Sequence, residues 1–105
     1  MTKEFVKSLD EEGNERMRVR LSITQGKLVD IVFQYESFIA KKWTPIVRYD
    51  LAHGFFHRDI MKLNGEKEKT VIQIVGLEEA AIFAEQDIKD KWEFYKQRYL
   101  KLLKK

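Results

Sequence analysis

Polar and apolar side chains alternate without a break in the stretch Arg16-Met17-Arg18-Val19-Arg20-Leu21-Ser22-Ile23-Thr24. Because successive side chains of a β-strand point to opposite faces, this pattern predicts a strand with one buried face. Gln25-Gly26 follows as a turn, and residues 28–36 alternate again. The two runs therefore predict an antiparallel hairpin.

Four further stretches, on either side of this hairpin, are typical of strands; they are residues 4–9, 43–50, 55–63 and 70–75. In the second of them, alternation places Trp43 on the same face as Val47. Pro45 favours a strand edge or a strand's first residues, because proline has no N–H to donate to a neighbouring strand. The connections are too short for parallel crossovers, so neighbouring strands are expected to run antiparallel.

The hydrophobic period changes after Gly76, where apolar residues recur at intervals of three and four. The apolar stripe comprises Leu77, Ala80, Ala81, Ala84, Ile88, Trp92, Tyr95, Tyr99 and Leu102. This spacing predicts one long amphipathic helix over residues 77–103. At about 1.5 Å per residue the helix spans roughly 40 Å, which exceeds the size of a compact domain of this length. Either the helix breaks, or its basic end projects and finds a partner, and the second alternative favours a homodimer.

Together these elements predict an α+β fold, in which a five- or six-stranded antiparallel β-meander carries the long C-terminal helix on one face. We expect a single domain over residues 1–105. The predicted core comprises Val19, Leu21, Ile23, Ile31, Phe33, Val47, Ile88, Trp92 and Tyr95.

The composition excludes several classes of protein. Cysteine is absent, which excludes disulfides and thiolate metal sites. No apolar run approaches the roughly 18 residues of a membrane helix, so we expect a cytoplasmic protein with no membrane partner. The formal charge of +3 is too small to identify a nucleic-acid partner by itself.

Both histidines fall in one short segment, Arg48-Tyr49-Asp50-Leu51-Ala52-His53-Gly54-Phe55-Phe56-His57-Arg58-Asp59. If the strands on either side of this segment pair as a hairpin, its polar groups converge near one end of the sheet. The candidate catalytic residues are His53, His57, Asp50 and Tyr49, and the candidate phosphate-binding residues are Arg48 and Arg58.

Three interpretations of this segment remain open. Histidine beside a carboxylate suits acid–base chemistry on a phosphodiester, with arginine stabilising the developing charge. Two histidines and two aspartates could hold a divalent metal, although no spacing here is diagnostic of one. The carboxylates could also serve only to orient the imidazole and guanidinium groups in a structural network. We assign no metal ligand and expect no cofactor.

The string Arg48-Tyr49-Asp50-x-Ala52-His53-Gly54-x-x-His57-x-Asp59 resembles a small uncharacterised family of prokaryotic proteins of about this length. It is similar, more distantly, to TumE-type toxins of toxin–antitoxin pairs, in which a Tyr-Asp pair precedes paired histidines; here each histidine stands alone. The toxin resemblance implies action on RNA or translation, and it extends to Tyr49, Asp50, His53 and His57.

Two functions of different classes follow. The first is a small binding module whose sheet face or helix meets a protein or nucleic-acid partner. The alternative is an RNA-directed, toxin-like hydrolase that uses His53 and His57, so whether the protein is an enzyme stays open. A basic row on one strand, Arg16, Arg18 and Arg20, lacks interleaved aromatic residues, which favours a solvated or partner-covered face over a nucleic-acid platform. Exposed imidazoles in an open cleft would favour the enzyme, and buried, mutually bonded side chains a structural role.

Overall fold

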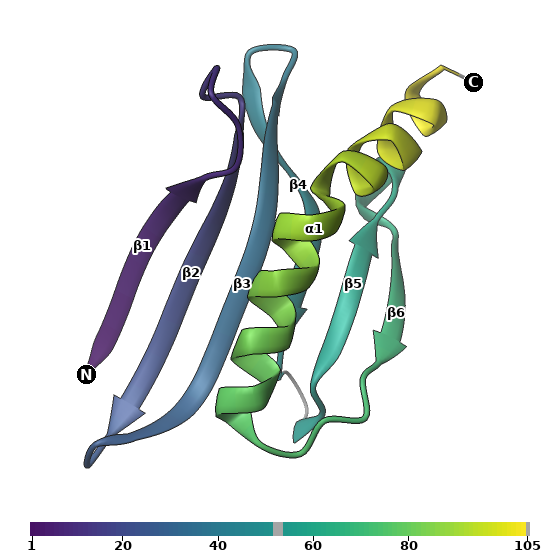
Figure 1. Cartoon of the computed structure of the whole chain (residues 1–105). Coiled ribbons are helices and arrows are strands. Elements are labelled where there is room, and N and C mark those ends of the chain that lie inside the picture. Colours follow the sequence, from purple (N-terminus) through teal and green to yellow (C-terminus); the bar gives the residue numbers. More distant parts are fainter. Residues whose placement is uncertain (52–53, 105) are drawn as a thin grey trace.

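The computed structural model describes residues 1–51 and 54–104. Within this part of the chain, six strands form one antiparallel sheet in chain order: β1 (Thr2–Ser8), β2 (Glu15–Thr24), β3 (Lys27–Ile39), β4 (Lys42–Asp50), β5 (His57–Met61) and β6 (Lys67–Val71). A single-turn 3₁₀ helix, η2 (Leu63–Gly65), connects the last two strands. The helix α1 (Leu77–Leu103) lies along one face of the sheet (Figure 1). The expected α+β meander with a C-terminal helix is confirmed.

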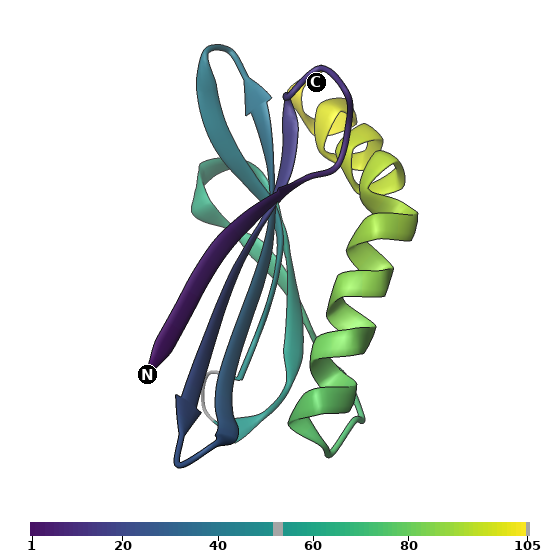
Figure 2. The same cartoon turned by 60° about the vertical axis from the view of Figure 1, so that its left-hand side comes forward.

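The sheet has one covered and one uncovered side, as Figure 2 shows. We call the side that packs against α1 the helix-covered face and the other the open face. Strand β2 shows the division, because Met17 and Val19 are buried under the helix while Arg18 and Arg20 are exposed on the open face. The turn between β2 and β3 is a two-residue one, with positive φ at Gln25 and Gly26. Such a turn matches the right-handed twist of the strands that it joins.

The core lies between the helix-covered face and α1. Most of the predicted core is confirmed, while Leu21, Ile23 and Trp92 are only half-buried. The buried apolar cluster comprises Met17, Val19, Ile31, Phe33, Tyr35, Ile46, Val47, Tyr49, Phe56, Ile60, Ala80, Ala84, Ile88 and Tyr95. The removal of these apolar side chains from water is the main force that holds the helix on the sheet.

A β-bulge reverses the predicted facing of Trp43. Tyr35 pairs with Val47 but the next residue of β3, Glu36, pairs with Pro45, so Ile46 is an extra residue in β4. An extra residue shifts the alternation by one, and the residues before it face the other way. Pairing with β5 begins only at Val47. The proline therefore lies where β4 has a free edge, as its missing N–H requires.

Two strand boundaries also differ from the prediction. Strand β5 begins at His57 rather than at residue 55, and β6 spans Lys67–Val71 rather than residues 70–75. Ile72 and Ile74 still pack against the core, which explains their apolar pattern, but they lie outside the ladder of paired strands.

The helix is continuous over its 27 residues, and its C-terminal turns do not pass the β3–β4 hairpin, which extends at least as far in the same direction (Figure 1). The molecule is accordingly elongated, with extents of 46 × 28 × 22 Å. The homodimer, which the sequence analysis based on a projecting helix end, stays a prediction. No helix in the described part of the chain has the length and apolar character that spanning a membrane demands.

Candidate functional site

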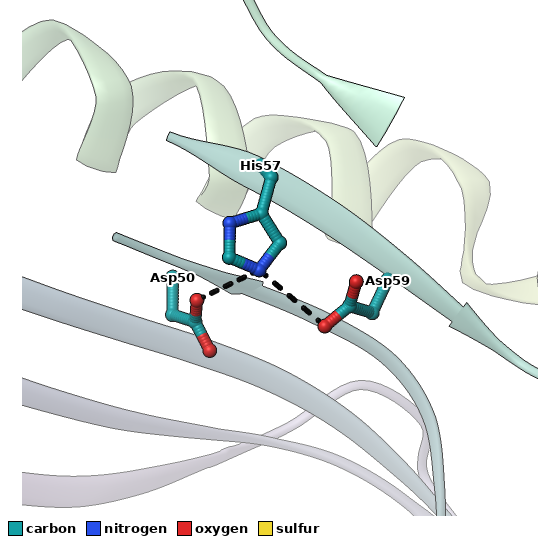
Figure 3. A group of neighbouring side chains, drawn as sticks. All are labelled: Asp50, His57 and Asp59. Carbon is teal, nitrogen blue, oxygen red and sulfur yellow. Dashed lines mark ion pairs between the residues drawn. The ribbon is translucent and has the colours of Figure 1, made fainter. Parts of the chain in front are cut away.

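Three buried polar side chains meet on the open face, where β4 ends and β5 begins. Asp50 and His57 are directly opposite each other across the two strands, and Asp59 follows two residues later on the same face. The exposed fractions of these residues are 8%, 2% and 1%. In Figure 3 the imidazole lies between the two carboxylates, with its Nε2 atom directed at both. The Nε2 atom is 2.9 Å from Asp50 Oδ1 and 3.4 Å from Asp59 Oδ2.

Within the described residues, Phe55, Arg48 and Lys67 contact this group, which we call the Asp–His–Asp cluster. His57 Nδ1 lies 3.1 Å from the carbonyl oxygen of Phe55. Arg48 donates from Nε to Asp50 Oδ2 at 2.6 Å, and from Nη1 to Gln34 at 3.3 Å. The ammonium group of Lys67 is 3.5 Å from Asp59 Oδ2. The other oxygen of Asp59, Oδ1, is buried and accepts no hydrogen bond.

These contacts determine which nitrogen of the His57 imidazole donates a hydrogen bond and which carries the lone pair. A neutral imidazole has one donor and one acceptor nitrogen, and here the nitrogen facing the Phe55 carbonyl has to be the donor. The bare lone pair of Nε2 would then point at two anionic oxygens. A cation at Nε2, either a proton or a metal ion, removes that repulsion. Asp50, His57 and Asp59 are also the group of described residues whose ligand atoms lie close enough, within 4.8 Å of one another, to hold a metal.

Tyr49 and Arg58 lie on the opposite side of the sheet, so the expected convergence does not hold for them. Each stands between open-face residues in its strand, and the alternation directs both toward α1. There, Tyr49 donates to Asp87 Oδ2 at 2.7 Å, and Arg58 donates to the Tyr95 hydroxyl at 3.3 Å. Tyr95 also donates to Asp87. These four residues form what we call the tyrosine–aspartate cluster.

In the tyrosine–aspartate cluster, Tyr49, Tyr95 and Asp87 are buried, while Arg58 is half-buried and its Nε atom has no hydrogen-bond partner. Burial and the hydrogen bond to Asp87 raise the pKa of Tyr95 to about 12. Burial, followed by the same carboxylate, also raises the pKa of Tyr49 well above its usual range. Neither hydroxyl can give up its proton near neutral pH, so this network is structural rather than reactive.

Sequence reasoning missed Asp87 and a second buried carboxylate, Glu15. Asp87 lies three residues after Ala84, on the apolar stripe of the helix, and this spacing could have identified it as a buried carboxylate. Glu15 accepts hydrogen bonds from Tyr35, at 2.6 Å, and from Lys96 of the helix. Its burial beneath α1 has no counterpart in the local sequence pattern, because it depends on a contact 81 residues away. His53 lies outside the described residues.

A hollow of about 390 Å³ opens on the same face of the sheet as the Asp–His–Asp cluster. Its lining comprises Glu4, Phe5, Val6, Arg18, Val19, Arg20, Val32, Gln34 and Arg48. Arg48 belongs to both features, because it lines the hollow and also binds Asp50. The two features therefore adjoin.

Aromatic rings lie at one end of the arginine row, contrary to the sequence expectation. The guanidinium of Arg16 is stacked 3.7 Å from the ring centroid of Trp43. Phe38 packs against the same indole, with ring centroids 5.2 Å apart, and is 42% exposed. The bulge in β4 causes this arrangement, since it turns Trp43 toward the open face.

Comparison with known families gives a match to a domain of unknown function (DUF7718) over residues 1–105. The chain belongs to the DUF7718 family. This agrees with the expectation of an uncharacterised family, and the family's description assigns no activity. No curated protein and no solved structure matches the chain in the corresponding comparisons.

In this DUF7718 chain, the residues of the sequence motif are divided between two faces. Arg48, Asp50, His57 and Asp59 meet on the open face, while Tyr49 and Arg58 are held beneath the helix. Of the four residues on the open face, Arg48 also lines the hollow and the other three are buried. The open face, with its hollow and its buried cluster, is the candidate functional surface.

Proposed function

We propose that the protein is a binding module whose open face takes single-stranded nucleic acid. The observation that carries the proposal is the hollow in that face, around which three guanidinium groups gather, those of Arg18, Arg20 and Arg48. A positively charged groove that follows a phosphate backbone is the common element of single-strand binding proteins.

Two of these arginines are available to a ligand. The side chain of Arg18 is 56% exposed, and its ion pair with Glu36 is a long one of 4.0 Å. Arg20 is exposed and forms no ion pair within the described residues. Because alternate side chains on a strand lie about 6.8 Å apart, the two guanidiniums can contact separate phosphates.

The rest of the surface suits the sugar and base of a nucleotide. Val6 and Val32 contribute apolar lining to the hollow, and Gln34 adds an amide that can donate or accept hydrogen bonds. The exposed ring of Phe38, beside Trp43 and the stacked Arg16, offers a flat surface on which a base could stack. An acidic peptide without aromatic residues would use the arginines but would have no ring to stack at this end of the row.

Binding without cleavage fits the contacts of His57. The residue is 2% exposed, and both ring nitrogens already face protein oxygen atoms. A general base needs a free nitrogen within reach of the substrate hydroxyl. Tyr49, which the toxin resemblance also implicates, donates to Asp87 beneath the helix. These contacts favour the binding module over the RNA-directed hydrolase.

The test is fluorescence anisotropy with a labelled oligouridine of about 12 nucleotides, a length within the usual site size. The double variant Arg18→Ala, Arg20→Ala should bind at least about tenfold more weakly. It should also show a slope of log affinity against log salt that is shallower by about 1.4, since each lost phosphate contact removes about 0.7.

The matched control is Lys101→Ala, Lys104→Ala, which removes the same charge at the end of α1. Equal weakening by this control would mean that only net charge matters and would refute the open-face proposal. Competition by polyglutamate as effective as that by unlabelled RNA would indicate an acidic protein partner instead. Shortening of the RNA by the wild-type protein on a denaturing gel would restore the hydrolase hypothesis.

A further inference from the structure

We propose that the Asp–His–Asp cluster is a binding site for a divalent transition-metal ion, with Zn²⁺ the best match to its donors. The ligands would be Asp50, His57 Nε2 and Asp59. One imidazole nitrogen and carboxylate oxygens are donors that Zn²⁺ accepts. Mg²⁺ and Ca²⁺ prefer oxygen ligands alone. The proposal is independent of RNA binding, since it concerns different atoms on the same face.

The spacing of the donor atoms is that of a coordination shell. The Nε2 atom lies 2.9 Å from one carboxylate oxygen and 3.4 Å from the other. With metal–ligand bonds of about 2.0–2.1 Å, neighbouring ligands are about 3.3 Å apart in a tetrahedron and about 2.9 Å apart in an octahedron. The two carboxylate oxygens lie within 4.8 Å of each other, so small shifts of the side chains would bring all three donors to one ion.

The contact of the other ring nitrogen of His57 also supports metal binding by Nε2. His57 Nδ1 is 3.1 Å from the Phe55 carbonyl oxygen, an acceptor that fixes the proton on this nitrogen. Metal-binding histidines commonly donate their second ring N–H to a carbonyl or carboxylate in this way. The lone pair of Nε2 is thereby directed at the space between the two carboxylates.

A buried acceptor without a donor is the second, independent sign of a missing ligand. Asp59 is 1% exposed, and its Oδ1 atom accepts no hydrogen bond. A buried carboxylate oxygen in this condition costs stability unless a donor or a cation reaches it. Because a carboxylate can bind a metal through both oxygens, an ion held by Asp59 in this bidentate way would satisfy Oδ1.

Lys67 is the cation that a metal ion would displace. Its ammonium lies 3.5 Å from Asp59 Oδ2, and its side chain is 50% exposed. A flexible, half-exposed lysine can swing into solvent when a divalent ion occupies the carboxylate. Arg48 can stay in place, since it binds Asp50 through Oδ2 while Oδ1 faces the imidazole. Removal of the Lys67 charge should consequently strengthen metal binding.

The experiment uses the full chain without an affinity tag, stripped of metal with EDTA. Titration with Co²⁺, a spectroscopic substitute for Zn²⁺, should give visible absorption bands that saturate at one ion per chain and disappear when Zn²⁺ is added. Calorimetry with Zn²⁺ should give the same stoichiometry, while Mg²⁺ should not bind at comparable concentrations.

Three variants locate the ion. Asp59→Asn should weaken Zn²⁺ binding at least about tenfold, whereas Asp90→Asn, which changes an exposed helix carboxylate, should bind as the wild type does. Lys67→Ala should bind Zn²⁺ more tightly than the wild type. Since this lysine is exposed, the variant remains informative even if Asp59→Asn fails to fold.

The proposal is overturned if Co²⁺ gives no saturable absorption. It is equally overturned if a folded Asp59→Asn chain binds as tightly as Asp90→Asn, because the ion then lies elsewhere. Unchanged or weaker binding by Lys67→Ala would likewise contradict it. RNA binding can survive each of these outcomes, so the two proposals fail separately.

Discussion

Buried carboxylates lie against the two faces of β4 and β5 in opposite conditions. Beneath the helix, Asp87 receives hydroxyl hydrogen bonds from Tyr49 and Tyr95, and both donors are neutral. On the open face, Asp50 and Asp59 share one imidazole, and an oxygen of Asp59 has no donor. In the first arrangement the carboxylate is satisfied by the chain's own side chains, which include Lys91 at 3.5 Å, although the Nε atom of Arg58 is buried without a hydrogen bond. The second leaves a place for a cation, and this difference separates a structural network from a candidate binding site.

The largest expected effect is the alkaline unfolding of the helix-covered side. Burial and hydrogen bonds to carboxylates raise the pKa of Tyr35, Tyr49 and Tyr95, the last to about 12. Above pH 10 the unfolded chain loses these three protons while the folded chain keeps them, so stability falls as the pH rises. Between its unfolded and folded pKa, each tyrosine lowers the free energy of unfolding by about 1.4 kcal/mol for each pH unit of increase. The three together lower it by about 4 kcal/mol per pH unit where their ranges overlap.

Urea unfolding at pH 9, 10 and 11 measures this slope. Tyr95→Phe should reduce it by about a third, because one of the three titrating hydroxyls is gone. Tyr99→Phe controls for the loss of a tyrosine hydroxyl outside the cluster. A slope in Tyr95→Phe equal to that of the wild type would show that lysine deprotonation, rather than the buried tyrosines, controls alkaline unfolding.

The second prediction concerns Asp87→Asn. The amide keeps the size of the side chain but replaces charge-assisted hydrogen bonds from Tyr49 and Tyr95 by neutral ones. We expect a loss of about 2 kcal/mol in the free energy of unfolding. Chemical denaturation at pH 7 is the measurement, and a loss below about 0.5 kcal/mol would contradict a structural role for this carboxylate.

The third prediction makes the same chemical change on the open face. In metal-free protein, Asp59→Asn should alter the free energy of unfolding by less than about 1 kcal/mol. The reason is that it removes a buried charge that has one oxygen without a donor, while the asparagine amide can still bond its neighbours. The pair Asp87→Asn and Asp59→Asn therefore tests the comparison directly. Equal losses in the two variants would mean that both clusters are structural.

The division of the fold into strands and a helix follows from hydrophobic period alone. Alternation in residues 16–24 and a spacing of three to four after Gly76 each identify an element that stays on one side of a core. Alternation along β5 likewise puts His57 and Asp59 on one face, and the register of β4 with β5 brings Asp50 opposite the histidine. This half of the candidate site was therefore visible in the sequence.

The remaining features depend on contacts between elements distant in the chain. The bulge at Ile46 arises from the pairing of β3 with β4, and it alone turns Trp43 toward the arginine row. To predict the role of Asp87 from the sequence, one would have to know which strand lies beneath that turn of the helix. Local pattern cannot supply such information, because tertiary register decides it.

The smallest expected effect tests whether exposed contacts also hold the helix-covered side together. Lys7 of the edge strand β1 donates to Glu85 of α1 at 2.9 Å, and Lys89 contacts the same carboxylate at 2.7 Å. Hydrogen bonds from Lys7 and then from Lys89 lower the pKa of Glu85, so their contribution is present at neutral pH and is lost as the pH falls into the acid range.

All three side chains are substantially exposed, however, and solvent and salt screen such pairs. Lys7→Ala should therefore cost no more than about 0.5 kcal/mol at low salt, and less at about 1 M salt, in urea unfolding at pH 7. A loss comparable to that of Asp87→Asn would show that attachment of β1 to the helix, rather than the buried tyrosine–aspartate cluster, limits the stability of this side of the sheet.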